Sequence, residues 1–135
     1  MTIKNTLISK GFVIAGLMNA SVLVFSKLFT SSSIPEFDAS VMSNFGLLMI
    51  FIWGLAYISV AKNYHQVKWL VFVFTIEKLI YGCVWINWMF YNSVSDVYDK
   101  DILAGVFYSI YGVNDWLFFV FFLLVFVQIL KTKSI

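Results

Sequence analysis

Three side chains that can carry or exchange charge lie in stretches of the sequence that are otherwise apolar. Glu77 and Lys78 are neighbours within residues 67–91, and Asp115 lies within residues 102–130. At the centre of a bilayer each group costs roughly 2.5–3.5 kcal/mol or more when it has no partner, so such residues face a protein interior and mark ion, proton or ligand sites. This trio is therefore predicted to bind a proton, a cation or a small amphipathic ligand.

Lys78 and Asp115 are predicted to form an ion pair. With a rise of 1.5 Å per residue, Lys78 lies about 16 Å from the start of its segment, near the middle of a hydrocarbon core about 30 Å thick. If residues 67–91 and 102–130 form a helical hairpin, Asp115 lies at the same depth on the other arm. Glu77 is rotated by about 100° from Lys78 around the helix, so it faces a different neighbour and is left without an ionic partner.

A set of aromatic and amide side chains is expected at the same depth as the three ionisable groups. Their hydroxyl, indole and amide groups need hydrogen-bond partners when buried in lipid, and Glu77 and Asp115 are strong acceptors. The predicted ligand or proton site consists of Glu77, Lys78, Asp115 and these aromatic and amide side chains. The members of the set are Asn19, Trp53, Tyr57, Tyr81, Trp85 and Tyr111.

Two interpretations of this site are open. In the first, Glu77, with Asp115, changes its protonation as a proton, cation or amphipathic ligand binds or passes. In the second, Lys78 and Asp115 form a buried staple that fixes the register of the helices, while Glu77 is protonated and hydrogen-bonded to tyrosine or asparagine. Because ionisable residues inside membrane spans are usually functional, we favour the first interpretation.

The sequence contains few residues for other kinds of chemistry. One cysteine, Cys83, and one histidine, His65, rule out a disulfide framework, zinc-finger spacing and bis-histidine haem, so neither a cofactor nor a metal is predicted. A serine-histidine-aspartate set and a glycine-rich phosphate loop are also absent from the sequence. The chain is not expected to be an enzyme; an enzyme that acts on a lipid with its two acids as acid and base is the minor alternative. No nucleic-acid partner is expected, because the nine lysines are spread along the chain without a basic stripe.

Four apolar segments must position these groups. The 135 residues are 61% hydrophobic and 12% charged, which is too little polar material to coat a water-soluble domain. Runs of about 20 apolar residues, the length that a helix needs to cross a bilayer, are predicted at residues 7–29, 41–61, 67–91 and 102–130. The predicted fold is an all-α membrane protein in which residues 1–135 form one domain, a four-transmembrane-helix bundle.

The lysines predict the orientation of these segments. Lys27 and Lys100 share their side with five acidic residues, whereas the other six lysines apart from Lys78 flank the opposite side. The positive-inside rule then places both termini and the 63–66 turn in the cytoplasm, and the 30–40 and 92–101 loops outside. The lysines on the predicted cytoplasmic side are Lys4, Lys10, Lys62, Lys68, Lys131 and Lys133.

Local patterns predict three further features. Ser33 and Glu36 have the spacing of a capping box, which favours a short interfacial helix in the outer 30–40 loop. Gly11, Ala15 and Asn19 recur every four residues, a pattern typical of close helix packing or, alternatively, of a homodimer seam. Aromatic residues near the segment ends are expected to be interfacial anchors. These residues are Tyr64, Trp69, Trp88, Tyr91 and Tyr98.

Two stretches in the middle of the chain have a distinctive pattern. They are FGLLMIFIWGLAY at residues 45–57 and IEKLIY at residues 76–81, which is followed by Trp85. With them, the middle third of the chain resembles a group of small, uncharacterised bacterial four-span proteins, a resemblance that brings no known activity. The small multidrug resistance exporters also have four spans and this length. Their membrane glutamate lies in the first span, where this chain has Asn19, so their activity is not transferred.

The sequence as a whole predicts a small multi-pass protein of the bacterial cytoplasmic (inner) membrane. Its midplane acidic and aromatic site is expected to serve the binding or proton-linked passage of an ion or small amphipathic ligand. The alternative is a non-catalytic scaffold or accessory subunit of a larger membrane complex. Besides the lipid bilayer, the expected partners are further copies of the chain or another membrane protein, because 135 residues enclose only a narrow interior.

Overall fold

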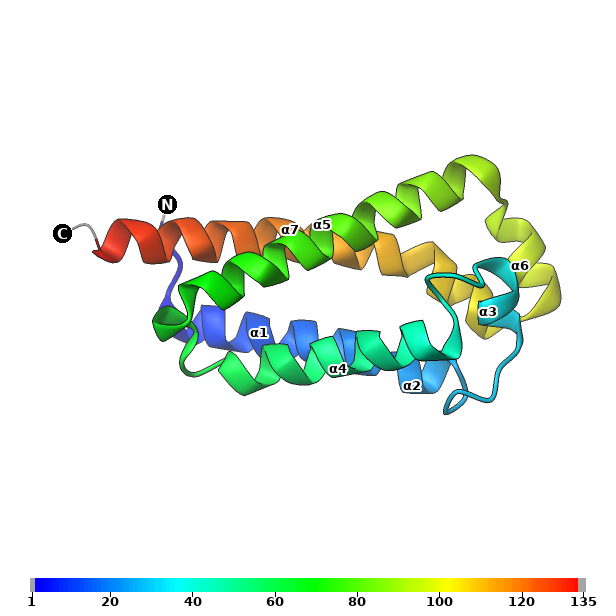
Figure 1. Cartoon of the computed structure of the whole chain (residues 1–135), viewed down its shortest axis with the longest axis horizontal. Coiled ribbons are helices and arrows are strands. Elements are labelled where there is room, and N and C mark those ends of the chain that lie inside the picture. Colours follow the sequence, from blue (N-terminus) through cyan, green and yellow to red (C-terminus); the bar gives the residue numbers. More distant parts are fainter. Residues whose placement is uncertain (1, 134–135) are drawn as a thin grey trace.

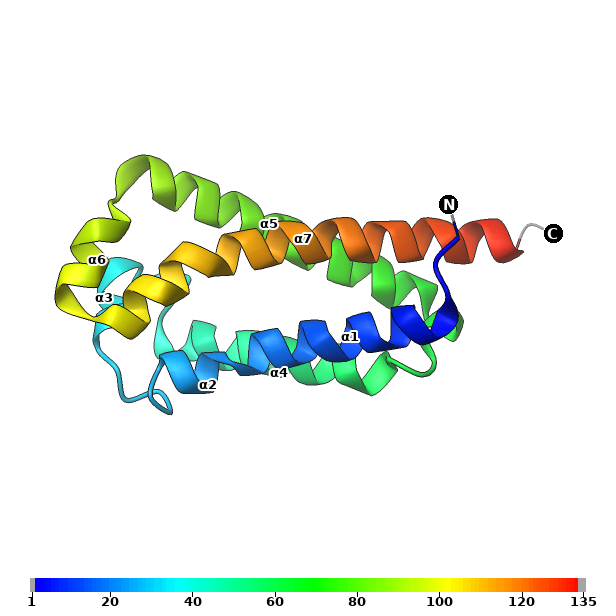
Figure 2. The same ribbon diagram turned by 180° about the vertical axis from the view of Figure 1, so that it is seen from behind.

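The computed structural model describes residues 2–133, whose helices are arranged as two antiparallel hairpins (Figure 1). α1 and its continuation α2 pair with α4, and α5 pairs with α7. Figure 2 shows from behind that both termini lie at one end of the bundle and that α3 and α6 lie at the other. No strand occurs within this range. In chain order the elements are α1 (Asn5–Ala20), α2 (Val22–Phe25), α3 (Ser33–Phe37), α4 (Asn44–Val60), the 3-10 helix η1 (Tyr64–Gln66), α5 (Lys68–Tyr91), α6 (Val94–Lys100) and α7 (Ile102–Lys133).

The long helices have the length and the surface of membrane spans. Within the described residues, three helical segments are long and apolar enough to cross a membrane: Asn5–Phe25, Lys68–Tyr91 and Ile102–Lys133. α4 is a shorter apolar helix of 17 residues. Large apolar side chains such as Leu17 lie exposed on the outside of the bundle, as expected for a surface that faces lipid. By helix hydropathy, the chain is an all-α, multi-pass membrane protein.

The first helical segment ends at Phe25, earlier than the apolar run predicted. Lys27, Leu28 and Phe29 have positive φ angles of 53°, 57° and 64°, so the chain makes a left-handed turn where residues 26–29 were expected to continue the helix. The predicted end of this segment at residue 29 was therefore wrong. The other boundaries differ by at most three residues: α4 covers 44–60 and not 41–61, and α7 continues to residue 133.

The left-handed turn leads to a prediction about stability. In this conformation the Cβ of an L-residue crowds the following carbonyl oxygen, which costs roughly 1–2 kcal/mol per residue, and glycine avoids the contact. Leu28 is exposed, so its side chain contributes little packing. We expect Leu28→Gly to be about 1 kcal/mol more stable than the matched Leu28→Ala variant, measured by unfolding in mixed micelles. Equal stability of the two variants would contradict the left-handed turn.

Both loops that were predicted to lie outside contain short helices. α3 lies where the capping-box spacing predicted a helix, but the box itself does not form: the helix begins at Ser33, and Ser32 at the cap position makes no side-chain cap. Glu36 instead pairs with Lys100 of α6. The helix α6 lies in residues 92–101, which were predicted only as a loop. Asp96 in its first turn and Lys100 in its last turn complement the helix dipole. This charge pattern could have indicated the helix, but a search for apolar runs does not detect it.

Asp101 caps α7 and connects it to the first hairpin. Its Oδ1 atom accepts hydrogen bonds from the backbone N–H groups of Leu103 (3.0 Å) and Ala104 (3.4 Å), and its Oδ2 atom lies 3.4 Å from Lys27 Nζ. Partial burial raises the pKa of the Asp101 carboxyl, but these hydrogen bonds and the lysine charge outweigh it and hold the pKa below its ordinary value. The cap is therefore ionised at neutral pH.

The core of the described chain consists of two apolar clusters with a polar layer between them. One cluster, around Phe12, Phe74 and Phe122, lies toward the termini. The other, around Met42 and Tyr108, lies toward α3 and α6. The helices α1, α5 and α7 each contribute polar residues between the two clusters. These buried residues, which we call the polar layer, are Asn19, Glu77, Lys78 and Asp115.

Two of the five expected interfacial anchors are buried instead. Trp88 stacks on Tyr108 with ring centroids 4.4 Å apart, and its Nε1 atom donates to the carbonyl oxygen of Phe37 in α3 (2.9 Å). Tyr64 is buried and donates to Asn5 Oδ1 (3.0 Å). These two predictions were wrong because the short segments beyond the span ends fold back over the bundle. The remaining three, Trp69, Tyr91 and Tyr98, are exposed.

Small residues bring helices of the same chain into contact. A Cβ atom added at Gly16 would lie 2.6 Å from the carbonyl oxygen of Gly54, and one added at Gly54 would lie 2.7 Å from that of Gly16, so the backbones of α1 and α4 come close together here, with Ile58 of α4 packed against Gly16. Gly11 faces the ring of Phe121 in α7 in a similar way. The small-residue pattern of α1 thus serves helix packing within the chain.

α5 and α7 pack through two reciprocal tryptophan-glycine contacts. The ring of Trp85 lies against Gly112, and the ring of Trp116 lies against Gly82. Trp85 Nε1 donates to the carbonyl oxygen of Tyr108 (2.7 Å), and Trp116 Nε1 donates to that of Gly82 (3.1 Å). Each indole therefore fills the space that a glycine leaves and has its N–H group satisfied by the opposite helix.

Candidate functional site

Lys78 lies at the centre of the polar layer. Its side chain is 1% exposed, and its Nζ atom donates to Asp115 Oδ1 (2.8 Å) and to Asn19 Oδ1 (2.9 Å). The same atom lies 5.2 Å from the centroid of the Tyr57 ring, within cation–π distance. The predicted ion pair between Lys78 and Asp115 is thus present in the structure. Asn19, which also donates to the carbonyl oxygen of Ile50 (3.0 Å), extends the network to α1 and α4.

Glu77 forms its hydrogen bond with α4 and does not take part in the ion pair. The hydroxyl of Tyr57 donates a hydrogen bond to Glu77 Oε2, and both side chains are buried. No lysine of the described chain lies within ion-pair distance of Glu77. The prediction that this acid would be turned toward a different neighbour and would lack an ionic partner agrees with this geometry.

The charges of the polar layer do not balance without a proton or a bound cation. Among the described residues the layer holds two carboxyl groups, Glu77 and Asp115, and one ammonium group, Lys78. It is neutral when one carboxyl group is protonated and carries one negative charge when neither is. Because an uncompensated charge is costly in a region of low dielectric constant, the layer favours uptake of one positive charge.

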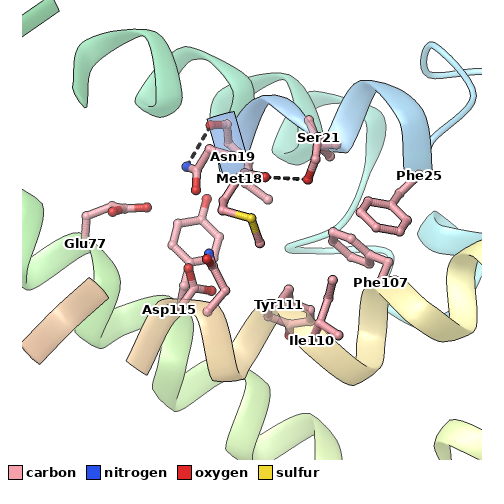
Figure 3. A pocket seen from close by; sticks show the side chains of 13 residues that line it. Met18, Asn19, Ser21, Phe25, Glu77, Phe107, Ile110, Tyr111 and Asp115 are labelled. Atoms are coloured by element: carbon pink, nitrogen blue, oxygen red, sulfur yellow. Dashed lines mark hydrogen bonds between the residues drawn. The ribbon is translucent and has the colours of Figure 1, made fainter. Parts of the chain in front are cut away.

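A small cavity adjoins the layer. Its volume is ≈ 40 Å³, and it lies between the first hairpin and α7, with Glu77 and Tyr81 of α5 and Ile50 of α4 in its wall. Figure 3 shows Asn19 and Met18 approaching it from one side and Asp115 and Tyr111 from the other. A water molecule needs about 10–15 Å³ on this measure, so the space fits about three. Sites for small organic molecules are roughly 300–1,000 Å³, so this cavity suits water, a proton or a small cation.

Tyr111 contributes a hydroxyl group that has no partner among the described residues. The residue is 7% exposed and lines the cavity, and its oxygen atom forms no hydrogen bond with any residue in 2–133. Leaving a buried hydroxyl unpaired costs about 1–3 kcal/mol, and such groups are rare in native proteins. A water molecule or hydrated ion in the cavity would supply the partner that the protein does not.

The structure brings together seven of the nine residues predicted for the site. Asn19, Glu77, Tyr81, Tyr111 and Asp115 line the cavity. Lys78 and Tyr57 join it through their hydrogen bonds to these residues, as described above.

The two predicted tryptophans have other roles. Trp53 packs edge-on against Phe74 in the apolar cluster near the termini, with ring centroids 6.0 Å apart. Trp85 lies against Gly112 and donates to the carbonyl oxygen of Tyr108. The structure does not bring these two side chains to the cavity. The prediction used their depth in the membrane but not the direction in which each side chain leaves its helix.

Several lining residues were not assigned to the site from the sequence. Asn114, beside Asp115, adds an amide to the wall, and the apolar part of the wall includes Val22, Phe25 and Phe107. The spacing of Phe107, Tyr111 and Asp115 at intervals of four residues is the signal that could have identified one face of α7. Nothing in their chemistry distinguishes Val22 and Phe25 from lipid-facing residues.

The cavity lies along the seam where the two hairpins meet. Met18 of α1 and Ile110 of α7 line it and are also exposed on the outer surface, whereas Asn19, Tyr111 and Asp115 are buried. Contacts between α1–α2 and α7 are sparse compared with those inside each hairpin. A water molecule or ion that enters the cavity from the protein surface therefore passes between α1–α2 and α7.

The described residues contain no group of three or more His, Cys, Asp or Glu side chains that could hold a metal ion. The acids of the polar layer are engaged by an ammonium and a phenol hydroxyl, which are hydrogen-bond donors.

No protein-family model, curated protein or solved structure matches the chain.

Proposed function

We propose that this chain is a four-span membrane protein whose polar layer binds and passes protons, and that Glu77 is the group that exchanges the proton. The observation that carries the proposal is the pairing of two buried carboxyl groups with one ammonium group beside a cavity of water size. A layer with this composition changes its charge by one whenever a proton enters or leaves.

The four proposed spans are α1–α2, α4, α5 and α7. α4 has 17 residues and a length of about 25 Å, which a modest local thinning of the bilayer accommodates. The end of the bundle with both termini carries six lysines, so the positive-inside rule supports a cytoplasmic location for it. We propose a bacterial inner membrane as its location, where α3 and α6 lie on the outer surface in this orientation.

The partners of each carboxyl group assign different roles to the two acids. Asp115 accepts from the Lys78 ammonium at 2.8 Å, which keeps it ionised. Glu77 has only the neutral hydroxyl of Tyr57, which can remain in place whether Glu77 is ionised or protonated. The mobile proton therefore belongs to Glu77.

The cavity supplies a short path from this group. Glu77, Tyr81 and Tyr111 line the same small space, and water within it connects a carboxyl group to phenol hydroxyls that both donate and accept. Carboxyl groups linked by water and hydroxyls form the proton relays of many pumps and transporters. A purely structural staple needs neither the space nor the unpaired Tyr111 hydroxyl, because cores are otherwise closely packed and their polar groups satisfied.

The test is proton flux into sealed proteoliposomes that contain a trapped pH-sensitive dye, under an imposed potential. Glu77→Gln keeps the size of the side chain and an acceptor for Tyr57 but removes the exchangeable proton. We expect flux to fall roughly 100-fold or more, the usual scale for loss of a proton-transfer group. Glu36→Gln removes an exposed carboxyl group on the outer side and serves as the matched control, with flux unchanged.

Two outcomes would reject this function. Equal flux in the wild type and Glu77→Gln would show that protons do not use this group. No flux in either protein would favour the alternative of a scaffold or accessory subunit, which is tested by co-purification with a second membrane protein. Circular dichroism and the temperature of unfolding establish that both variants are folded.

A further inference from the structure

A groove on the outside of the first hairpin has polar and basic residues at one end and apolar walls. It is lined by residues of α1, of α4 and of the segment after α4, and its volume is ≈ 530 Å³. Figure 1 shows that the start of α1 and the end of α4 lie near the end of the bundle with both termini. It is separate from the cavity at the polar layer and shares no lining residue with it. Its chemistry is therefore independent of the proposed proton site.

Lys10 and Lys62 stand on the two sides of the groove. Lys10 lies in the second turn of α1, and Lys62 lies just after the end of α4; both line the groove and are exposed. Neither forms an ion pair in the part of the chain that the structure describes. The acidic residues outside the polar layer lie in and around α3 and α6, at the opposite end. They are Glu36, Asp38, Asp96, Asp99 and Asp101.

Apolar side chains continue the groove from the lysines toward the middle of the bundle. Val13 and Ile14 of α1 form one wall, and Ile58 of α4 forms the other. Ile58 also lies against Gly16, where α1 and α4 come into contact, so the groove ends there. Along α1, the distance from Lys10 to Gly16 is about 9 Å, enough for the first part of an acyl chain.

The geometry points to a binding site for one anionic glycerophospholipid, with its phosphate between Lys10 and Lys62 and its acyl chain against Val13, Ile14 and Ile58. Basic pockets between membrane helices on the cytoplasmic side are suited to such headgroups. The hydroxyl of Ser9 and the amide of Asn63 line the same end and offer further donors. A free phosphate would use the lysines but not the apolar walls, and a choline headgroup would bring a third cation next to the two lysines.

The test measures phosphatidylglycerol binding to the full chain in detergent by native mass spectrometry. The variant Lys10→Gln/Lys62→Gln is compared with Lys4→Gln/Lys68→Gln, which removes the same charge from the same end but outside the groove. We expect about 30-fold weaker binding for the first variant, which corresponds to about 1 kcal/mol for each lysine, and a change below about threefold for the control. Lys10→Arg/Lys62→Arg should retain binding, because the charge and the fold are preserved.

Three lipids and inorganic phosphate are the probes that distinguish the sources of the headgroup. Dioleoyl phosphatidylglycerol should bind the wild type more tightly than the dihexanoyl form, and both more tightly than dioleoyl phosphatidylcholine. Equal weakening in the two glutamine variants would overturn the site, since the lysines would then act only as a diffuse positive surface. Displacement of the lipid by millimolar inorganic phosphate, or equal binding of phosphatidylcholine, would also overturn it. None of these results depends on proton flux.

Discussion

Replacing Lys78 with methionine should lower the free energy of unfolding by about 3–5 kcal/mol, the range found when one partner of a buried ion pair is removed. Lys78 is the only ammonium group of the polar layer among the described residues, and it donates to both Asp115 and Asn19. Without it, two buried carboxyl groups remain with no cation. Unfolding in mixed micelles, followed by tryptophan fluorescence, measures the change.

The double variant Lys78→Met/Asp115→Leu should recover most of that loss. It replaces both charges with apolar groups of similar size, an exchange that is often neutral or stabilising. A double-mutant cycle with the two single variants should therefore give a large coupling energy, and additive effects would reject the pairing. Lys100→Met is the control, because it breaks the exposed pair with Glu36 and should cost less than about 1 kcal/mol.

Gly112→Ala should destabilise the second hairpin by about 3 kcal/mol, near the upper end of the range for an overpacked core. The added methyl group would overlap the five-membered part of the Trp85 ring. That ring cannot move away freely, because its Nε1 atom is held by the carbonyl oxygen of Tyr108 at 2.7 Å. The variant must therefore separate α5 from α7 or break this hydrogen bond.

Gly82→Ala is the matched control for this prediction. Its methyl group would meet Trp116 Cε2 at 2.8 Å, a lesser clash that a small shift of the ring relieves, so we expect a loss of about 1 kcal/mol. Thermal unfolding in the same detergent gives both values. If the two alanine variants were equally stable, the close contact of Trp85 with Gly112 would be incorrect.

The central ion pair could be predicted from the sequence because lipid leaves charged groups few options. Lys78 and Asp115 lie at equal depth on the two arms of one hairpin, so each is the available partner of the other. The segment predicted at residues 67–91 matches α5, Lys68–Tyr91, almost residue for residue. Polar residues flank it on both sides, and the apolar run therefore has clear limits.

Features that depend on direction and on backbone conformation could not be predicted in this way. Depth places Trp53 and Tyr57 equally well in the polar layer, but only Tyr57 reaches Glu77, while Trp53 faces Phe74. The left-handed turn at residues 27–29 includes the apolar Leu28 and Phe29, which extended the predicted segment to residue 29, because hydropathy does not report the sign of φ. The cavity and the unpaired Tyr111 hydroxyl arise only when side chains from α1, α2, α4, α5 and α7 are packed together.

The distribution of charge between the two hairpins has a consequence for how the chain enters the membrane during synthesis. α4 has no charged residue, and the only one in α1–α2 is Lys10, in the second turn. In the proposed four-span topology, we expect this hairpin to insert as soon as it leaves the ribosome. α5 carries Glu77 and Lys78 at its middle, so its insertion into the bilayer alone costs several kcal/mol. Insertion together with α7 lowers this cost, because α7 brings Asp115 as the partner of Lys78. Asn19 and Tyr57 then complete the polar layer when the hairpins dock, which makes that layer the last part of the protein to assemble.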